Sequence, residues 1–295
     1  MSPAAPRRVA IISGAGKGLG RAYAHYLAAR GVAVVVNNRR RESDVEPSAD
    51  AVVREVMDAG GEAAAHYGAA EDPATGESLL ELALERFGRL DAVIANAGVS
   101  EAATFRRQDV DSVADNIAIN LLGTAYLLLP TFRHLYAQRR GHVLLSTSAA
   151  GLYGEHGLPA YSASKAGLIG LMRSLALEGR PHNVFVNAIA PFARTQMTED
   201  ALAAAGVDGL GAGEVAPVAA QLVAEDCELS GEVIIAAGGR MARAAMLCSG
   251  AVDVPADSDA LREQLSELAR TPVTRAHGGA VAMFRDFVGA GDDDS

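Results

Sequence analysis

A glycine-rich turn near the start of the chain constrains the fold more than any other stretch. A β-branched run at residues 9–12 ends directly in SGAGKGLG at 13–20, and an apolar-periodic segment follows up to Gly31. This order predicts a strand, a glycine turn and a helix, with a second strand at 32–36. Glycines in such a turn let the backbone approach a pyrophosphate, and the next helix offers its N–H groups and positive dipole end. The predicted dinucleotide contacts are Gly14, Lys17, Gly18, Leu19 and Gly20.

The alternation of strands and helices continues along the chain. Further strands are predicted at 62–67, 91–95, 142–145, 184–189 and 232–236, with helices at 50–59, 75–87 and from Pro159 onward. This alternation predicts an α/β fold of the Rossmann type: a doubly wound, mostly seven-stranded parallel sheet with helices on both faces. We expect a single dinucleotide-binding catalytic domain over 1–248, including a substrate lid near 192–213. Residues 249–295 form a partly helical C-terminal extension to which the sequence assigns no role.

The composition restricts the partners. The chain of 295 residues carries a formal net charge of −10, which argues against nucleic acid or an anionic membrane as the main partner. The N-terminus shows neither a secretory apolar core nor a membrane span, so a cytoplasmic location is expected. Cys227, Cys248 and the scattered histidines lack the spacing of a zinc site. No metal is therefore predicted, and the thiols are expected to be reduced and incidental.

The residues after the second predicted strand bear on cofactor choice. In dinucleotide sites of this kind an acidic residue here usually accepts hydrogen bonds from the adenosine ribose. This chain has Asn38 and Arg39 instead. Asn38 does not repel a 2′-phosphate, and Arg39 together with Lys17 could neutralise one, which favours NADP(H) over NAD(H). The alternative is that the arginines are solvated loop charges, which leaves NAD(H) open.

Small polar residues follow later strands, at the edge where open parallel sheets bind ligands. Asn96, Ala97 and Gly98 follow the fourth predicted strand, and Ser148 lies just beyond the fifth. Asn120 stands among apolar neighbours and is expected inside a helix. Its alternative is a solvent-facing or backbone-bonded side chain.

Tyr161 and Lys165 carry the predicted chemistry. They are four residues apart, so on a helix they share one face, and the ammonium lies near the phenol. A nearby cation favours the phenolate and is expected to lower the pKa of Tyr161, as general acid–base catalysis near neutral pH requires. A Tyr and a Lys at this spacing are common on helix surfaces. The dinucleotide-binding glycine turn in the same chain favours a catalytic role for this pair.

Taken together, these motifs resemble those of the short-chain dehydrogenases/reductases. The family's TGxxxGxG appears as SGAGKGLG, its NNAG as residues 95–98, and its YxxxK as Tyr161 to Lys165, with Ser148 upstream. The resemblance spans roughly residues 8–240. VVVNN, SAAGLYGEHGLPAYSASKAGLIGL and NAIAPFARTQMT further resemble the (3R)-hydroxyacyl-CoA dehydrogenase part of type 2 peroxisomal multifunctional enzymes. No hydratase or sterol-carrier domain follows, so a stand-alone dehydrogenase is expected.

The resemblance implies a role for each matching residue. Tyr161 would donate or accept the proton, Lys165 would lower its pKa and bond the nicotinamide ribose, and Ser148 would orient the substrate oxygen. Asn120 matches the residue that holds a proton-relay water, and the cofactor contacts extend to Pro191 and Thr195. The implied reaction is hydride transfer between NAD(P)(H) and a secondary alcohol or ketone, with a 3-hydroxyacyl or 3-oxoacyl thioester as one candidate substrate. A homodimer or homotetramer is implied, with a small-molecule carbonyl or alcohol as substrate.

Five positions depart from the family pattern. Ser13 replaces Thr and keeps the hydroxyl, whereas Ala95 replaces an Asn that supports a bond between strands. Asn38 replaces the Asp of the closer subgroup, Gly68 replaces an adenine-contacting Asp, and Phe192 replaces a smaller residue beside the nicotinamide. Acyl-CoA specificity is therefore not simply inherited. A non-catalytic dinucleotide-binding or sensing protein on the same fold is the alternative function, and a structural subunit that pairs with a catalytic partner is a third.

Overall fold

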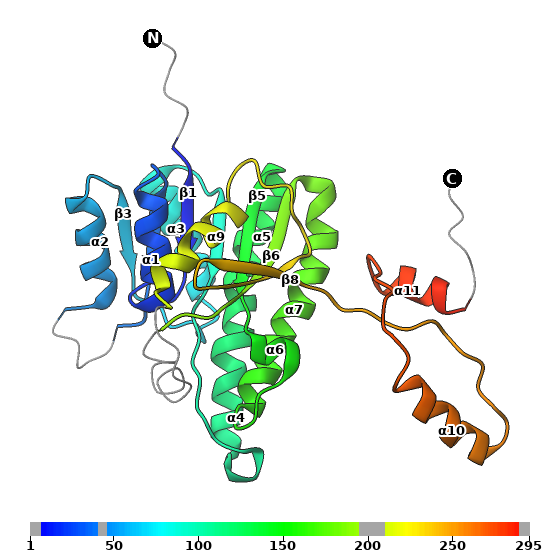
Figure 1. Ribbon diagram of the computed structural model, residues 1–295. Helices are drawn as coiled ribbons and strands as arrows, with labels where there is room; N and C mark the ends of the chain where they lie inside the picture. The colour runs from blue at the N-terminus through cyan, green and yellow to red at the C-terminus, as the bar shows by residue number, and fades with distance from the viewer. Residues whose placement is uncertain (1–6, 41–45, 195–209, 289–295) are drawn as a thin grey trace. The chain divides into compact units, whose positions relative to one another are not determined.

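The computed structural model describes residues 7–40, 46–194 and 210–288 (Figure 1). The chain divides into two compact units, Met1–Arg243 and Ala244–Ser295. The domain end predicted from the sequence, residue 248, lies close to this division. Part of the predicted lid, 195–209, and the predicted contact Thr195 lie outside the described residues.

The first unit is built on one sheet whose strands follow the order β3-β2-β1-β4-β5-β6-β7-β8. The strands are β1 (Val9–Ile12), β2 (Ala33–Asn37), β3 (Ala63–His66), β4 (Ala92–Ala95), β5 (Gly141–Ser146), β6 (Val184–Pro191), β7 (Val233–Ala237) and β8 (Arg240–Ala244). The first seven pair in parallel. The strand order reverses between β1 and β4, and in doubly wound sheets the ligand crevice opens at the carboxyl ends of such strands.

The Rossmann-type α/β class is confirmed, but the sheet has an eighth strand that the sequence did not reveal. Gly238 and Gly239 join β7 to β8, with φ of 52° and 70°. Two consecutive residues at positive φ form the tight turn of an antiparallel hairpin. Four of the five β8 side chains are exposed, so the strand lacks the apolar alternation that marks a half-buried strand. Charged residues on such an edge strand also oppose pairing with another sheet.

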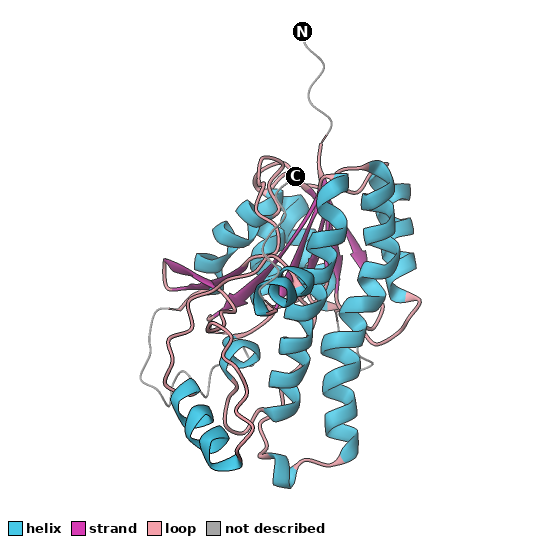
Figure 2. Ribbon diagram, turned by 90° about the vertical axis from the view of Figure 1, so that its right-hand side faces the viewer, coloured by secondary structure: helices cyan, strands magenta, loops and turns pink. Residues whose placement is uncertain are grey.

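Helices cover both faces of the sheet (Figures 1 and 2). The helices of the first unit are α1 (Gly18–Ala28), α2 (Ser48–Asp58), α3 (Thr75–Phe87), α4 (Val110–Ile117), α5 (Gly123–Gln138), α6 (Ala149–Tyr153), α7 (Pro159–Gly179) and α9 (Ala212–Leu222). On one face α1 packs against α9 and α2, and elsewhere α3 packs against α5 and α4 against α7. The strands between these layers are buried on both faces, as the continuous apolar runs of β1 and β2 require.

A π-helical turn, Ala118–Leu122, joins α4 to α5, so the three form one long helical segment. Within the described part of the chain, residues 110–138 form the single helix that is long and apolar enough to cross a membrane, and a third of its most apolar window is buried. Core helices of water-soluble proteins meet the same criterion, and α5 packs against α3 and β5. Its length and composition therefore decide nothing about a membrane.

The second unit contains α10 (Ser258–Leu268) and α11 (Ala280–Phe287). An antiparallel bridge joins Cys248 to Arg275, so the chain returns on itself around α10. Asp257 caps α10 by accepting hydrogen bonds from the backbone N–H groups of Asp259 and Ala260, at 3.0 and 2.8 Å. Helix α10 lies within the C-terminal extension that the sequence predicts to be partly helical.

Candidate active site

The glycine turn between β1 and α1 brings the backbone of two strands together. Gly14 has φ of 63°, and a Cβ there would lie 2.7 Å from the Cα of Ala97. No other residue type fits without moving the backbone. Helix α1 begins at Gly18 with no side-chain hydrogen bond at its cap. Its first N–H groups are therefore available to an anion, as a dinucleotide pyrophosphate requires.

Ser13 and Asn96 hold the ends of three strands in place. The Ser13 hydroxyl accepts hydrogen bonds from the backbone N–H groups of Asn96 and Ala97, at 3.0 and 3.1 Å. The Asn96 side chain donates to Gly14 O at 3.2 Å, and Ser146 donates to its Oδ1 at 3.2 Å. Asn96 was predicted as a cofactor contact. Its side-chain bonds show that it also ties the glycine turn to β4 and β5.

A cavity of about 290 Å³ opens at this edge of the sheet. Of the predicted cofactor contacts that the structure describes, it brings together all but Gly20: Gly14, Lys17, Gly18, Leu19, Asn38, Arg39, Asn96, Ala97, Gly98, Tyr161, Lys165 and Pro191. Gly20 lies behind the turn, where a Cβ would approach Gly14 O to 2.3 Å, so it is needed for packing. The sequence contains two lysines, Lys17 and Lys165, and both line the cavity.

Lys165 is the most strongly perturbed cation of the site. Its side chain is 4% exposed, and its ammonium donates to Ser146 O at 2.8 Å. Burial lowers its pKa from 10.5 to about 8, because the low-dielectric surroundings disfavour the charged form. Thr147 donates to Lys165 O at 2.7 Å, so the chain just after β5 is tied to α7 at this residue.

The pKa of Tyr161 differs from the sequence prediction. Burial raises it above its ordinary value, while a hydrogen bond with the Ser148 side chain acts in the opposite direction. The expected lowering by Lys165 is not seen. The Lys165 Nζ lies 5.6 Å from the centre of the Tyr161 ring and donates to Ser146 O. In the protein without a bound cofactor, desolvation of the phenol therefore affects the pKa of Tyr161 more than its neighbouring groups do.

Asn120 lies on the π-helical turn and is fully buried. Its Oδ1 accepts from Val99 N at 2.8 Å, and its Nδ2 donates to Val99 O at 3.0 Å and to Ser164 Oγ at 3.1 Å. The backbone-bonded alternative from the sequence therefore describes this side chain. Asn120 clamps the chain just after Gly98, where a Cβ would lie 2.8 Å from Asn120 Oδ1 and 3.3 Å from Lys165 Nζ.

Sequence reasoning missed an acidic residue that lines the cavity beside Arg39. Arg39, which follows β2, forms an ion pair with Glu71, which follows β3, and both line the cavity. Asn38 donates to Ser48 Oγ at 2.7 Å. A Cβ on Gly16 would lie 2.7 Å from the Cγ of Asn38, so the glycine leaves room for this side chain. The position of Glu71 in the sequence could have predicted this contact. Glu71 comes shortly after a parallel strand, at the same edge of the sheet as Arg39.

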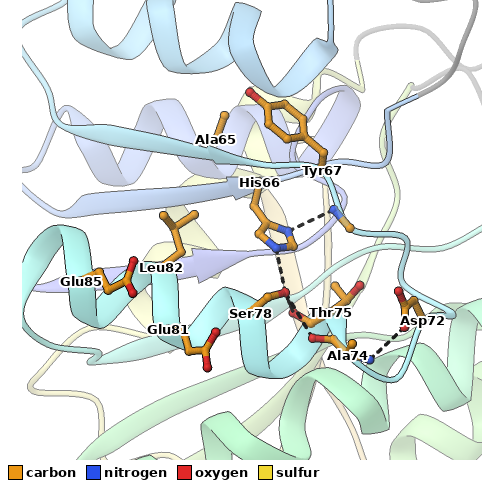
Figure 3. Close-up of a pocket in the computed structure, with 11 residues that line it drawn as sticks. Ala65, His66, Tyr67, Asp72, Ala74, Thr75, Ser78, Glu81, Leu82 and Glu85 are labelled. Carbon is orange, nitrogen blue, oxygen red and sulfur yellow. Dashed lines mark hydrogen bonds between the residues drawn. The ribbon is translucent and has the colours of Figure 1, made fainter.

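A second, open cleft of about 480 Å³ lies between β3 and α3 (Figure 3). Gly68 lines both this cleft and the cavity of about 290 Å³. His66 Nδ1 accepts from Gly68 N at 3.2 Å and lies 3.1 Å from Asn37 Nδ2, so the ring proton belongs on Nε2, which lies 2.9 Å from Ser78 Oγ. Burial lowers the pKa of His66. Since these bonds occupy both ring nitrogens, we assign His66 to holding the loop at Gly68.

Comparison with known proteins places the chain. A family model described as short chain dehydrogenase matches residues 8–205. The chain belongs to the short-chain dehydrogenase/reductase family. Members are oxidoreductases that use NAD or NADP, and the glycine turn and cavity described above fit such a dinucleotide.

Individual relatives support this assignment. A short-chain type dehydrogenase/reductase of Mycobacterium tuberculosis is 37% identical over 248 residues, which cover 83% of this chain and 87% of the relative. The peroxisomal multifunctional enzyme type 2 of Mus musculus is 39% identical over 231 residues, or 76% of this chain and 31% of that enzyme. A 3-oxoacyl-[acyl-carrier-protein] reductase of Synechocystis is 36% identical over 194 residues, or 65% of this chain and 77% of the reductase.

A solved short-chain dehydrogenase from Mycobacterium avium superposes with a TM-score of 0.80 at 32% identity, covering 92% of this chain and 98% of that one. The chain matches less than a third of the length of the mouse enzyme. The resemblance drawn from the sequence is therefore confirmed for the family and for its likeness to the multifunctional enzymes.

Proposed function

We propose that this short-chain dehydrogenase/reductase interconverts a secondary alcohol and a ketone, with Tyr161 as the general acid and base. The observation that carries the proposal is the meeting of three groups beside one cavity. The Tyr161 hydroxyl is hydrogen-bonded to Ser148, the Lys165 ammonium lies near the Tyr161 ring, and the glycine turn lines the same cavity. A proton donor, a cation and a dinucleotide site in one place support hydride transfer.

The glycine turn, the N-terminus of α1 and residues 96–98 would hold the dinucleotide. When the dinucleotide is bound, its nicotinamide ring carries the hydride. In the reductive direction Tyr161 donates its phenolic proton to the carbonyl oxygen of the substrate, and Ser148 orients that oxygen by a second hydrogen bond. In the oxidative direction the Tyr161 phenolate takes the proton from the alcohol.

Lys165 would counter the effect of burial on Tyr161. Its pKa of about 8 keeps most of the ammonium charged at pH 7, and a buried positive charge favours the phenolate. The hydrogen bonds between Asn120 and Val99 hold the chain next to Gly98, where an added Cβ would lie 3.3 Å from the Lys165 ammonium. Asn120 would therefore act as a positioning residue, and the proton-relay water implied by the family resemblance stays a prediction.

For the cofactor we propose a modest preference for NADP(H). Lys17 and Arg39 line the cavity, and Asn38 brings no negative charge to its adenosine end. The preference is limited because Arg39 is paired with Glu71. A carboxylate at this place would repel a 2′-phosphate while its partner attracts one.

For the substrate we propose a 3-hydroxyacyl or 3-oxoacyl thioester. The support is the similarity to the Synechocystis protein named as a 3-oxoacyl-[acyl-carrier-protein] reductase. The location was predicted as cytoplasmic, which stays a prediction because the mouse relative is named as peroxisomal.

We also propose that the chain associates with itself through α5 and α7. Large apolar side chains on these helices are exposed in the single chain, among them Leu129 at 53% and Leu177 at 59%. Burying such side chains against a second copy removes apolar area from water, which favours association. A homodimer and a homotetramer both satisfy this argument.

The test is a fluorescence titration with NADH and NADPH, followed by turnover assays with the tighter-binding nucleotide. The substrate panel contains simple cyclic ketones, 3-oxoacyl thioesters and the corresponding alcohols. We expect tighter binding of NADPH and oxidation or reduction of at least one panel member. Binding without turnover of any member would favour the non-catalytic dinucleotide-binding protein, and a wide preference for NADH would contradict the argument from Asn38, Arg39 and Lys17.

A further inference from the structure

A line of polar groups in the second unit joins Cys248, His277 and Asp286. Cys248 Sγ lies 3.6 Å from His277 Nδ1, and His277 Nε2 lies 3.0 Å from Asp286 Oδ2. An ionised carboxylate only accepts hydrogen bonds, so Nε2 carries the ring proton and Nδ1 presents its lone pair to the thiol. The imidazole is thus placed to accept the thiol proton. The thiol also lies 3.8 Å from Arg275 O, as a weak donor.

The backbone fixes this arrangement. Cys248 N donates to Arg275 O at 2.9 Å, and Arg275 N donates to Cys248 O at 3.0 Å. Alternate residues of an extended segment point to the same side, which brings both Arg275 and His277 to Asp286, a residue of α11. Arg275 Nη1 donates to both Asp286 oxygens at 3.0 Å. These hydrogen bonds, from His277 first and then from Arg275, lower the pKa of Asp286 and keep its carboxylate ionised.

An apolar pocket of about 320 Å³ has Cys248 among its lining residues. Its walls come from α10, α11 and residues 248–255, and its apolar side chains include Val254, Leu261, Leu265, Leu268, Met283 and Phe287. On α10 the leucines follow the i, i+4, i+7 spacing of one helix face. Cys248 and Asp286 line the same pocket. A nucleophile, a base and a carboxylate that orients the base therefore meet beside a space suited to an apolar chain.

We propose that Cys248 is a nucleophile that accepts an acyl group from an apolar acyl thioester whose chain occupies this pocket. As Sγ attacks the thioester carbonyl carbon, His277 Nδ1 takes the thiol proton, and Asp286 stabilises the imidazolium that forms. The carbonyl carbon bonds to Cys248 Sγ, the original carbon–sulfur bond breaks, and the departing thiolate takes the proton from His277. The products are an S-acylated Cys248 and a free thiol, with no net oxidation or reduction.

The pocket beside Cys248 shares no lining residue with the dinucleotide cavity. Under this proposal Cys248 is a nucleophile, whereas the sequence led us to expect an incidental thiol. Cys248 and His277 lie 29 positions apart in the chain. No local spacing in the sequence therefore indicates that their side chains are neighbours. Cys227, the other cysteine, is buried at 7% exposure. It serves as an internal control in every labelling experiment on the full chain.

The first experiment uses the full wild-type chain and octanoyl-CoA as the probe. We expect intact-mass analysis to show one octanoyl group per chain, and peptide mapping to place it on Cys248 with none on Cys227. Hydroxylamine should remove it, as it does a thioester. The absence of octanoylated Cys248 after prolonged incubation would overturn the proposal.

The second experiment measures alkylation by iodoacetamide at pH 7. His277→Gln should slow alkylation of Cys248 by about tenfold or more, because the thiol loses its base. His156→Gln, at an exposed histidine of the first unit, should leave the rate unchanged. Equal rates in the wild type and His277→Gln would overturn the role of His277. Far-UV circular dichroism checks folding, and if His277→Gln fails to fold, Asp286→Asn is expected to slow alkylation through loss of the oriented imidazole.

Discussion

Replacing Lys165 with Met should make the protein more stable while it removes turnover. A fall of the Lys165 pKa from 10.5 to about 8 corresponds to about 3 kcal/mol of destabilisation by the buried ammonium at neutral pH. Lys165→Met also removes the hydrogen bond to Ser146 O, which costs about 1 kcal/mol. Ser146 lines the cavity, so water can replace the lost donor. The net gain is about 2 kcal/mol, or about 5 °C in Tm for a chain of this size.

The gain should depend on pH in a defined direction. The folded pKa of Lys165 lies below the unfolded value, so between pH 8 and 10.5 the unfolded chain binds more protons than the folded one. Wild-type stability therefore rises with pH across this window, because the cost of burying the ammonium disappears. The advantage of Lys165→Met should be full below about pH 8 and lost above about pH 10.5, where only the missing hydrogen bond to Ser146 O distinguishes the two proteins.

Urea unfolding of both proteins at pH 7 and pH 10 measures this difference. Lys17→Met is the matched control, since Lys17 is the other lysine of the chain and is exposed. Reductive ¹³C-methylation offers a direct check, because two lysine signals accompany that of the N-terminus and Lys17→Arg identifies one of them. A Lys165→Met protein less stable than wild type at pH 7, or equally stabilised at both pH values, would refute the reasoning.

Three further substitutions test separate parts of the site. Glu71→Gln should lower the Kd for NADPH about fivefold with little effect on the Kd for NADH, since a negative charge beside the bound 2′-phosphate is removed. Glu81→Gln in the neighbouring cleft is the control. An equal change in Kd for both nucleotides would contradict the assignment of Glu71. Gly14→Ala should weaken cofactor binding by at least about tenfold, because the new Cβ meets Ala97. Gly31→Ala, at φ of 81° with open space around it, separates backbone strain from that collision. Ser13→Ala should cost about 1–3 kcal/mol in urea unfolding, because two backbone N–H groups lose their acceptor, whereas Ser13→Thr should be close to wild type.

The sequence predicted the parts of the fold that depend on local pattern. The strand, glycine turn and helix at residues 9–28 appear where the apolar periodicity placed them. Tyr161 and Lys165 lie on one helix, α7, because four-residue spacing is fixed by helix geometry. Strand β8 escaped detection because its exposed side chains give no alternation.

Other properties of the site arise from contacts between distant segments. The pKa of Tyr161 is raised because packing around α7 buries the phenol, and no spacing along the chain encodes that burial. Glu71 meets Arg39 only because β2 and β3 are neighbours in the sheet. The line from Cys248 to Asp286 likewise depends on the return of the chain at Arg275.

The most direct test of the account compares the wild type with Tyr161→Phe under single-turnover conditions. Cofactor affinity is measured by fluorescence, and hydride transfer is followed at the nicotinamide absorbance with the best substrate of the panel. We predict that Kd for the nucleotide changes by less than about twofold while the rate of hydride transfer falls by about 100-fold or more. A rate within about threefold of the wild type would contradict the assignment of Tyr161 as the acid–base residue.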